Sequence, residues 1–449
     1  MSETTHRRAE AEDTDLDHAT VEQVTAEVTR RLVAAATDDE AAGRAPLSGG
    51  AFRNRAAEVL SAVLEENART TIARGQMPLG RDHEERLRRT VLARVSGLGP
   101  LEELLAEPGV QDINIIGGQV FMRFTDGRRE QRPPIAANDS ELIALVRRLA
   151  AESAGGERRW DASAPLLNVQ LPAGQRLAAV MDVSHAPAVA IRCHDSRRMS
   201  LRHLHERGMV DDLARQLLAA ATQARLNMII SGATGAGKTT LLRAIASYIP
   251  AHERLVTIED TFELGLHHDD EAHPECVALQ ARPPNLEGVG EISMADHMRH
   301  ALRMSPDRVI VGETRGPETL AVLTAMSMGT DGSLATIHAS SAQDVMTKIA
   351  AYTAQSPERL GREATSLLVA AAQPLIVHIY SRPNGVRMVT SVREVVGAEG
   401  GQVASNEIYR RDPATGQRRL AAPPSERVAQ ALQEAGLDPR VLSEHGWAR

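Results

Sequence analysis

One short stretch, residues 227 to 241, constrains the fold of this chain more than any other part of it. Within it, Gly232, Gly237, Lys238 and Thr239 satisfy the pattern G-x-x-x-x-G-K-[ST]. The apolar run just before the pattern predicts a buried strand, and apolar residues that recur at helical spacing after it predict a helix. Since strand, loop and helix follow one another in the required order, the pattern predicts a phosphate-binding loop and not an accidental glycine-rich turn.

The chemistry of this loop follows from its residue types. Glycines at positions 232, 235 and 237 let backbone N–H groups turn inward around phosphate oxygens, and the new helix points its positive end at the same anion. Lys238 is expected to reach the β- and γ-phosphates of ATP, and the Thr239 hydroxyl is expected to bind Mg²⁺. The residues predicted to bind nucleotide are Gly232, Ala233, Thr234, Gly235, Ala236, Gly237, Lys238, Thr239 and Thr240.

The composition argues against several classes of protein. The formal net charge is -8, and only two tryptophans, four tyrosines and four phenylalanines are present, which disfavours a base-stacking surface for nucleic acid. Cys193 and Cys276 are the only cysteines, so neither a disulfide framework nor a four-cysteine zinc site is expected. There is no run of about 18 apolar residues and no apolar segment near the start. We therefore expect no membrane span, no signal peptide and a cytosolic protein whose membrane association goes through a partner.

At 449 residues the chain has room for two or three domains, and its patterns change along its length. The first residues are acidic and aperiodic, three amphipathic helices follow, and short alternating runs between turn signals then predict an α+β domain. Beyond a linker, apolar strands alternate with helices, which predicts a mainly parallel α/β sheet. The predicted segments are a disordered acidic tail at 1–17, a helical region at 18–96, an α+β domain at 97–199, a linker at 200–210, an α/β nucleotide-binding domain at 211–400, and a C-terminal extension with small helices at 401–449.

Two apolar strands are predicted to end in carboxylates near the phosphate loop. Glu259 follows the apolar run 255–258, and Glu313 follows the run 309–311 with one glycine between. In an open α/β sheet the carboxyl ends of strands face the ligand, so both groups are candidates to hold Mg²⁺, directly or through water. Glu313 is also placed to polarise the water that attacks a γ-phosphate, and an ion pair with Arg315 is the competing interpretation. For Glu259 the competing interpretation is an ordinary charge cluster after a strand.

Four further residues complete the candidate site. His338 ends a third predicted strand, where an imidazole can report a terminal phosphate by hydrogen bonding, although a histidine in a strand is more often simply buried. ATP hydrolysis in ring-shaped motors commonly needs a guanidinium on the transition state, supplied across a subunit interface. Arg176 and Arg192 in the α+β domain and Arg282 in a long loop are the candidates, each with a plain surface charge as its alternative role.

The order of these motifs resembles the type II/IV secretion ATPase superfamily. After the phosphate loop come T-I-E-D, A-R-P-P-N-L-E-G, A-L-R-M-S-P-D-R-V-I-V-G-E-T-R-G and D-G-S-L-A-T-I-H-A. Within the superfamily the chain is most similar to the CpaF/TadA branch of Tad (Flp) pilus ATPases, from about Leu98 to Val395. The stretches V-Q-D-I-N-I from Val110 and L-P-A-G-Q-R-L from Leu171 resemble the N-terminal domain of that branch.

The resemblance implies an α/β fold with a RecA-like ATPase domain, preceded by a mobile α+β N-terminal domain, in a homohexamer that binds ATP and Mg²⁺. In this resemblance Glu259 matches the Asp-box acid, Glu313 the Walker B glutamate and His338 the His-box histidine. Arg176 and Arg192 fall where the N-terminal domain of the family offers arginines to the nucleotide.

Two positions depart from the family pattern, and one branch of the family is disfavoured. Thr330 stands where the family often has histidine and Ser340 where it often has asparagine, which affects the expected His-box contacts more than the expected ATPase activity. Type II secretion ATPases often carry a four-cysteine zinc module, which two cysteines cannot build.

The expected function is a cytoplasmic ATPase that hydrolyses ATP to drive assembly of a Tad/Flp type IV pilus or a related secretion machine, with retraction left open. It is expected to act at the inner face of the cell membrane through inner-membrane platform proteins, without binding nucleic acid or inserting into the membrane. The alternatives are a VirB11-like type IV secretion ATPase, a RecA-like DNA motor and a nucleotide-gated scaffold with little turnover. DNA-stimulated turnover distinguishes the DNA motor, and intact Lys238 and Glu313 disfavour the scaffold.

Overall fold

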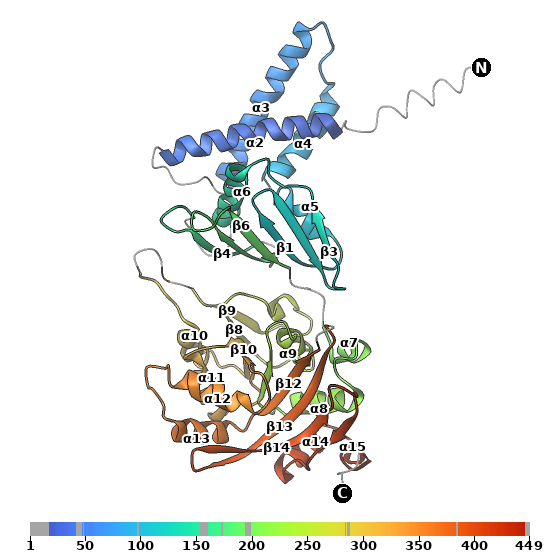
Figure 1. The fold of residues 1–449 in the computed structure, drawn as a ribbon, viewed down its shortest axis with the longest axis vertical. Helices are drawn as coiled ribbons and strands as arrows, with labels where there is room; N and C mark the ends of the chain where they lie inside the picture. The colour runs from blue at the N-terminus through green and yellow to red at the C-terminus, as the bar shows by residue number, and fades with distance from the viewer. Residues whose placement is uncertain are drawn as a thin grey trace, which may run out of the picture. The chain divides into compact units, whose positions relative to one another are not determined.

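The computed structural model describes residues 18–41, 47, 49–96, 98–152, 160–171, 174–193, 199–282, 284, 288–382 and 385–444 (Figure 1). The chain forms two compact units, Met1–Asp195 and Ser196–Arg449. The acidic tail predicted at residues 1–17 lies outside the described residues. Within the described ranges, no helix combines the length and the apolar character that a membrane span requires.

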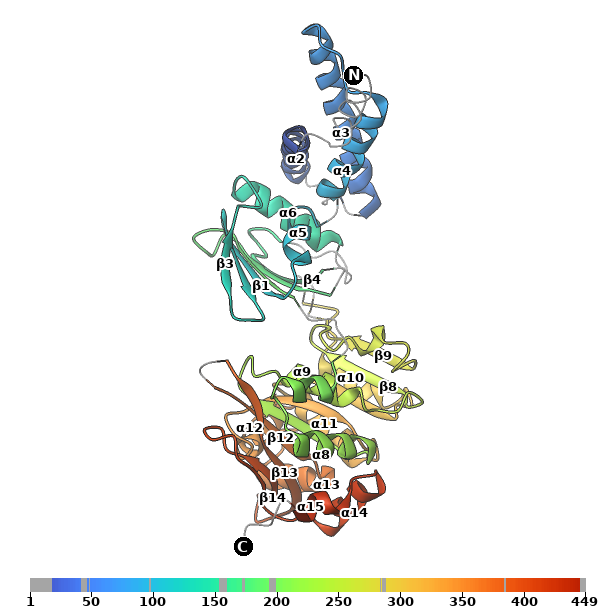
Figure 2. The ribbon, with the colours of Figure 1, turned by 90° about the vertical axis from the view of Figure 1, so that its right-hand side faces the viewer.

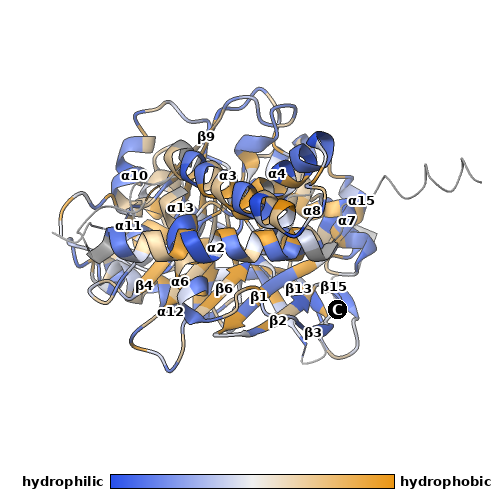
Figure 3. Cartoon of the chain, turned by 90° about the horizontal axis from the view of Figure 1, so that it is seen from above, coloured by the Kyte–Doolittle hydropathy of each residue, from blue (hydrophilic) through white to orange (hydrophobic). Residues whose placement is uncertain are grey.

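Three helices with a shared apolar seam open the first unit: α2 (His18–Ala41), α3 (Gly49–Ala73) and α4 (Arg81–Ser96). Val24 and Val28 lie one turn apart on α2 and are buried in one cluster with Leu60 of α3 and with Leu87 and Val91 of α4. Figure 3 shows both hydrophilic and hydrophobic residues along α2. Apolar residues that recur every three or four positions place one stripe of each helix against the others, which is why this stretch is helical.

A six-stranded antiparallel sheet completes the first unit, in the order β3-β2-β1-β6-β5-β4. Ile113 and Ile115 of β1 are buried with Leu142 and Val146 of α6, because alternate side chains of a strand point to the same face. The strands and helices are β1 (Val110–Ile116), β2 (Gln119–Phe124), β3 (Arg129–Arg132), β4 (Leu166–Gln170), β5 (Arg176–Val180), β6 (Ala188–Arg192), α5 (Leu101–Ala106) and α6 (Asp139–Glu152).

A nine-stranded sheet forms the second unit, in the order β15-β14-β13-β12-β7-β11-β10-β8-β9. From β12 to β9 neighbouring strands run parallel, and from β12 to β15 they run antiparallel. The predicted α/β class with a mainly parallel sheet is therefore confirmed, and the order β12-β7-β11-β10-β8 around the first strand is typical of a RecA-like core. The strands are β7 (Met228–Gly232), β8 (Leu255–Glu259), β9 (Cys276–Gln280), β10 (Arg308–Thr314), β11 (Leu334–His338), β12 (Leu375–Ser381), β13 (Arg387–Glu399), β14 (Gln402–Arg411) and β15 (Arg418–Leu420).

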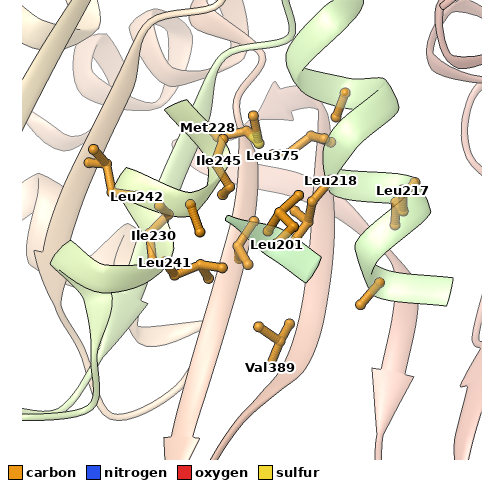
Figure 4. Packing of buried hydrophobic residues seen from close by; sticks show 14 of the residues in the cluster. Leu201, Leu217, Leu218, Met228, Ile230, Leu241, Leu242, Ile245, Leu375 and Val389 are labelled. Carbon is orange, nitrogen blue, oxygen red and sulfur yellow. The ribbon is translucent and has the colours of Figure 1, made fainter. Parts of the chain in front are cut away.

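Helices cover both faces of this sheet, and two apolar cores result (Figure 2). Ile230 of β7 packs in one core with Leu217 and Leu241 (Figure 4), whereas its neighbour Ile229 packs in the other core with Leu323. A strand buried on both faces must be apolar at consecutive positions, which explains the unbroken apolar run before the phosphate loop. The helices are α7 (Leu201–Glu206), α8 (Asp212–Gln223), α9 (Lys238–Ala246), the short η1 (Leu266–His268), α10 (Met294–Ala301), α11 (Glu318–Ser327), α12 (Asp344–Thr353), α13 (Arg362–Ala372), α14 (Glu426–Glu434) and α15 (Pro439–Glu444).

The structure corrects the linker predicted at residues 200–210. This segment belongs to the second unit, where Ser200 caps α7 by accepting a hydrogen bond from the backbone N–H of His203. Leu201 and Leu204 are buried in the core, and the carbonyl oxygen of Met209 accepts a hydrogen bond from β13. Two leucines three residues apart after a capping serine are enough to anchor one helical turn, and the sequence interpretation overlooked them.

The C-terminal extension predicted from residue 401 is also corrected. Its two small helices are present as α14 and α15, but β14 and β15 come before them and extend the same sheet from β13. Tyr409 of β14 is fully buried and donates a hydrogen bond to Asp211 at the start of α8. Residues beyond 400 are therefore an integral part of the second unit, and no domain boundary lies there.

Candidate functional site

The phosphate loop joins β7 to α9, as predicted, and its backbone requires glycine at particular positions. Gly235 and Gly237 have φ values of 74° and 93°, in the left-handed region that favours glycine. A Cβ atom on Gly232 would lie 2.8 Å from the backbone oxygen of Ile379 in the neighbouring strand β12. Gly237 caps α9, so Lys238 is the first helical residue and the positive end of the helix faces the loop.

The side chain of Lys238 lies beside His338, and His338 connects it to Glu313. Lys238 Nζ is 3.2 Å from His338 Nδ1 and 3.2 Å from the backbone oxygen of Ala233 within the loop. Lys238 Nζ also lies 3.3 Å from His338 Nε2, and this Nε2 lies 2.7 Å from Glu313 Oε1. The parallel strands β7, β11 and β10 are neighbours in the sheet, and their carboxyl ends therefore bring these three residues together.

Burial shifts the acidity of two of these groups. It lowers the pKa of Lys238, although the nearby carboxylates of Glu313 and Glu263 act to raise this pKa. Burial and the nearby charge of Lys238 lower the pKa of His338, and Glu313 opposes that change. The lowered pKa favours a neutral imidazole near pH 7, and the contact with the Glu313 carboxylate favours the tautomer in which Nε2 carries the proton and donates it to Glu313.

Glu313 lies inside β10, and the strand runs one residue past it. The strand register shifts between Val311 and Thr314, so Glu313 stands at an irregularity that turns its side chain toward β11. The competing pairing with Arg315 is not formed, because Arg315 makes its ion pair with Asp260 at 2.6 Å. Glu313 is thus held by His338 and not by the neighbouring arginine.

Glu259, at the end of β8, is turned into the protein. It is only 2% exposed, and its Oε2 accepts hydrogen bonds from the backbone N–H groups of Glu263 at 2.7 Å and Leu264 at 2.8 Å. A Cβ atom on Gly312 would lie 3.2 Å from the Cγ of Glu259, so the glycine before Glu313 makes room for this carboxyl. Burial raises the pKa of Glu259 to about 7, although the two backbone donors favour its charged form.

The donors available for Mg²⁺ are the Thr239 hydroxyl and the two predicted carboxylates. Among the described residues there is no group of three or more histidine, cysteine or acidic side chains that could hold a metal ion by themselves. Glu313 contacts His338 and Glu259 binds backbone amides, so neither is arranged as a direct ligand. This donor set fits a magnesium ion held largely by water and nucleotide oxygens, as is usual for this ion beside phosphates.

The predicted arginines Arg176 and Arg192 lie side by side on the sheet of the first unit. They are cross-strand partners on β5 and β6, and Arg192 pairs with Asp112 of β1 at 2.9 Å. Both line a hollow of about 1020 Å³ on the face of this sheet. The structure therefore places these two predicted arginines next to each other on neighbouring strands.

Arg282 comes two residues after the edge strand β9. The sequence interpretation did not predict this strand and treated the segment as part of a long loop. Arg282 forms an isolated bridge with Ile292, and its Nε donates to the backbone oxygen of Gly290 at 2.7 Å. Its guanidinium therefore holds the loop at the edge of the sheet. No contact between Arg282 and the Lys238 cluster is seen in the part of the chain that the structure describes.

One residue beside the phosphate loop was not predicted at all. A Cβ atom on Gly237 would lie 3.6 Å from the Cδ and 3.9 Å from the Nη1 of Arg387, the first residue of β13. The sequence offers only one hint of this proximity, the hairpin turn that brings β13 back along β12. Pairing of β12 with β7 is what carries the arginine to the loop.

Comparison with known proteins agrees with these motifs. A family model described as "Type II/IV secretion system protein" matches residues 114–418. A putative conjugal transfer protein of Mycobacterium tuberculosis is 33% identical over 321 residues, which cover 70% of this chain and 88% of that protein. VirB11 of Agrobacterium tumefaciens is 31% identical over 272 residues, which cover 54% of this chain and 76% of that protein.

A solved structure is also similar. It is the VirB11 ATPase from the Brucella suis type IV secretion system, in complex with sulphate, which is 25% identical to this chain. The match covers 65% of this chain and 91% of the VirB11 chain, with a TM-score of 0.35. The family model spans well over half of the sequence and the mycobacterial relative is matched along most of its length. This chain therefore belongs to the type II/IV secretion system protein family.

Proposed function

We propose that the chain is a motor that hydrolyses ATP and drives a secretion or pilus machine. The observation that carries this proposal is the row Lys238, His338 and Glu313 at the mouth of a phosphate loop. It combines a cation for the phosphates with a carboxylate for the attacking water, and these are the two groups that phosphate transfer from ATP needs.

The residues divide the chemistry among themselves in this proposal. Lys238 and the backbone N–H groups of the loop bind the β- and γ-phosphates, and Thr239 and water shared with Glu313 would hold Mg²⁺, which neutralises the phosphate charge. Glu313 orients and polarises water, and His338 keeps its carboxylate in place through the 2.7 Å contact. Glu259 stabilises the loop after β8 by accepting a hydrogen bond from Glu263, and it packs beside Gly312. It is also the candidate for contact with Mg²⁺ through water.

A hexameric ring at the inner face of the cell membrane is part of the proposal. Arg176 and Arg192 would reach the nucleotide of the same or of a neighbouring subunit when the first unit closes on the second. Loss of the γ-phosphate would then release the arginines, and sequential closing around a ring would move an inner-membrane platform protein. We propose a Tad/Flp pilus or a related machine as the object of this work.

The names of the relatives favour a second candidate of the same class. Conjugal transfer proteins and VirB11 are among the sequences that this chain resembles. A VirB11-like ATPase of a type IV secretion system would use the same site chemistry, so the two candidates differ in their partner and not in their reaction.

The test measures ATP turnover by the purified full chain with platform protein in membranes and, separately, with DNA. The proposal expects stimulation by the membranes that contain the platform protein and no stimulation by DNA. Stimulation by DNA with a steep salt dependence, together with no response to the platform, would reject it in favour of a DNA motor.

A further inference from the structure

The hairpin of β12 and β13 brings an arginine to the phosphate loop from outside the known motif. Ile379 of β12 pairs with Gly232, the last residue of β7, and Ser381 of β12 pairs with Arg387. Arg387 therefore stands just beyond the carboxyl end of β7, at the same edge of the sheet as the loop. Its main-chain position follows from the pairing of β13 with β12.

The side chain of Arg387 turns toward the start of α9. A Cβ atom on Gly237 would lie 3.6 Å from its Cδ and 3.9 Å from its Nη1. The same position would lie 3.2 Å from the Cε of Met209, whose backbone oxygen accepts a hydrogen bond from Val389 of β13 at 2.8 Å. The stem of Arg387 thus packs near Gly237, the residue directly before Lys238.

The guanidinium of Arg387 has no carboxylate partner among the residues that the structure describes. It is exposed, and among the residues that the structure describes it makes no ion pair, in contrast to Arg393 further along the same strand, which lies 3.8 Å from Glu407. Two features of the same sign begin beside it, because Gly237 precedes Lys238 and caps the positive end of α9. Holding a guanidinium beside two other positive features is favourable when an anion lies between them.

We propose that Arg387 is a further nucleotide-binding residue, which contacts the phosphate chain of ATP from the β13 side within the same subunit. The inference rests on the proposed function, since it assigns a second cation to the same phosphate site. A planar guanidinium suits this role because it can donate two parallel hydrogen bonds to phosphate oxygens.

The test compares ATP affinity, measured by calorimetry on the full chain, in Arg387→Met, Arg387→Lys and the control Arg410→Met. Methionine keeps an apolar stem beside Gly237 but removes the charge, and lysine keeps the charge. Arg410 is a 59% exposed arginine on the neighbouring strand β14. We expect ATP affinity to fall by roughly tenfold or more in Arg387→Met, the scale of one charged hydrogen bond, to fall less in Arg387→Lys, and to stay unchanged in the control.

Three outcomes would overturn the inference. Wild-type ATP affinity in Arg387→Met would show that no phosphate is contacted, and equal losses in the methionine and lysine variants would show that the arginine acts by packing. Both leave the proposed function standing, provided that the wild-type chain binds ATP. A wild-type chain without measurable ATP affinity would instead contradict the proposed function, and this inference with it.

Discussion

Replacing Glu259 with glutamine should make the protein more stable at pH 8, even though Glu259 belongs to the candidate site. The carboxyl is 2% exposed, and burial raises its pKa from the ordinary 4.5 to about 7. A charged carboxylate at this position therefore costs folding free energy. Glutamine keeps a carbonyl oxygen that can accept the hydrogen bonds of Glu263 and Leu264, and it never carries the charge.

The magnitude follows from the change in pKa. The unfolded carboxyl loses its proton near pH 4.5 and the folded one near pH 7, so the folded state binds more protons between these values and stability falls as the pH rises through them. At about 1.36 kcal/mol for each pH unit, the cost reaches roughly 3 kcal/mol above pH 7. It should be below about 1 kcal/mol at pH 5 and absent at still lower pH.

The assay is denaturant-induced unfolding of the wild type and of Glu259→Gln at pH 5 and pH 8, with Glu291→Gln as an exposed carboxylate control. We expect the gain of Glu259→Gln over the wild type to be large at pH 8 and small at pH 5, and the control to show no such difference. A variant that is less stable than the wild type by the same amount at both pH values would refute the reasoning. It would mean that the fold needs the charged carboxylate for its two backbone hydrogen bonds.

Three further substitutions test other parts of the structure. Gly232→Ala should lower both the unfolding midpoint and ATP affinity, because its Cβ would lie 2.8 Å from a backbone oxygen, whereas Gly397→Ala meets no atom within 4 Å and should lower neither. Arg308→Met should lower the free energy of unfolding by about 1–3 kcal/mol, because the buried Glu253 loses the arginine that binds both of its oxygens and keeps only Arg225, at 2.8 Å. Arg192→Gln should leave unfolding unchanged and reduce ATP turnover, and normal turnover in this variant would argue against a role for the arginine at the nucleotide.

The parts of the site that could be predicted are those written in local sequence. The strand, loop and helix around Lys238 share one short segment, in which the glycine positions and the apolar spacing each indicate the same structure. The proximity of His338 to Glu313 could also be expected, because the carboxyl ends of parallel strands meet at one edge of a sheet.

The parts that could not be predicted depend on how distant segments pack. The orientation of Glu259 is set by two backbone N–H groups in the loop after β8, and no sequence pattern predicts this orientation. Arg387 reaches the phosphate loop only because β12 pairs with β7 and the hairpin folds back at the correct length. The strands β9 and β14 were missed because they are recruited to the sheet by neighbours that are far away in the sequence.

The central claim is that this site hydrolyses ATP, with Lys238 binding its phosphates and Glu313 acting on water. The most direct measurement is ATP binding and ATP turnover, side by side, in the folded wild type, Lys238→Ala and Glu313→Gln. We predict that Lys238→Ala loses both binding and turnover, and that Glu313→Gln retains ATP while its turnover falls about 10²-fold or more, the scale of a general base. Normal turnover in folded Glu313→Gln, or near-normal turnover in Lys238→Ala, would contradict the account.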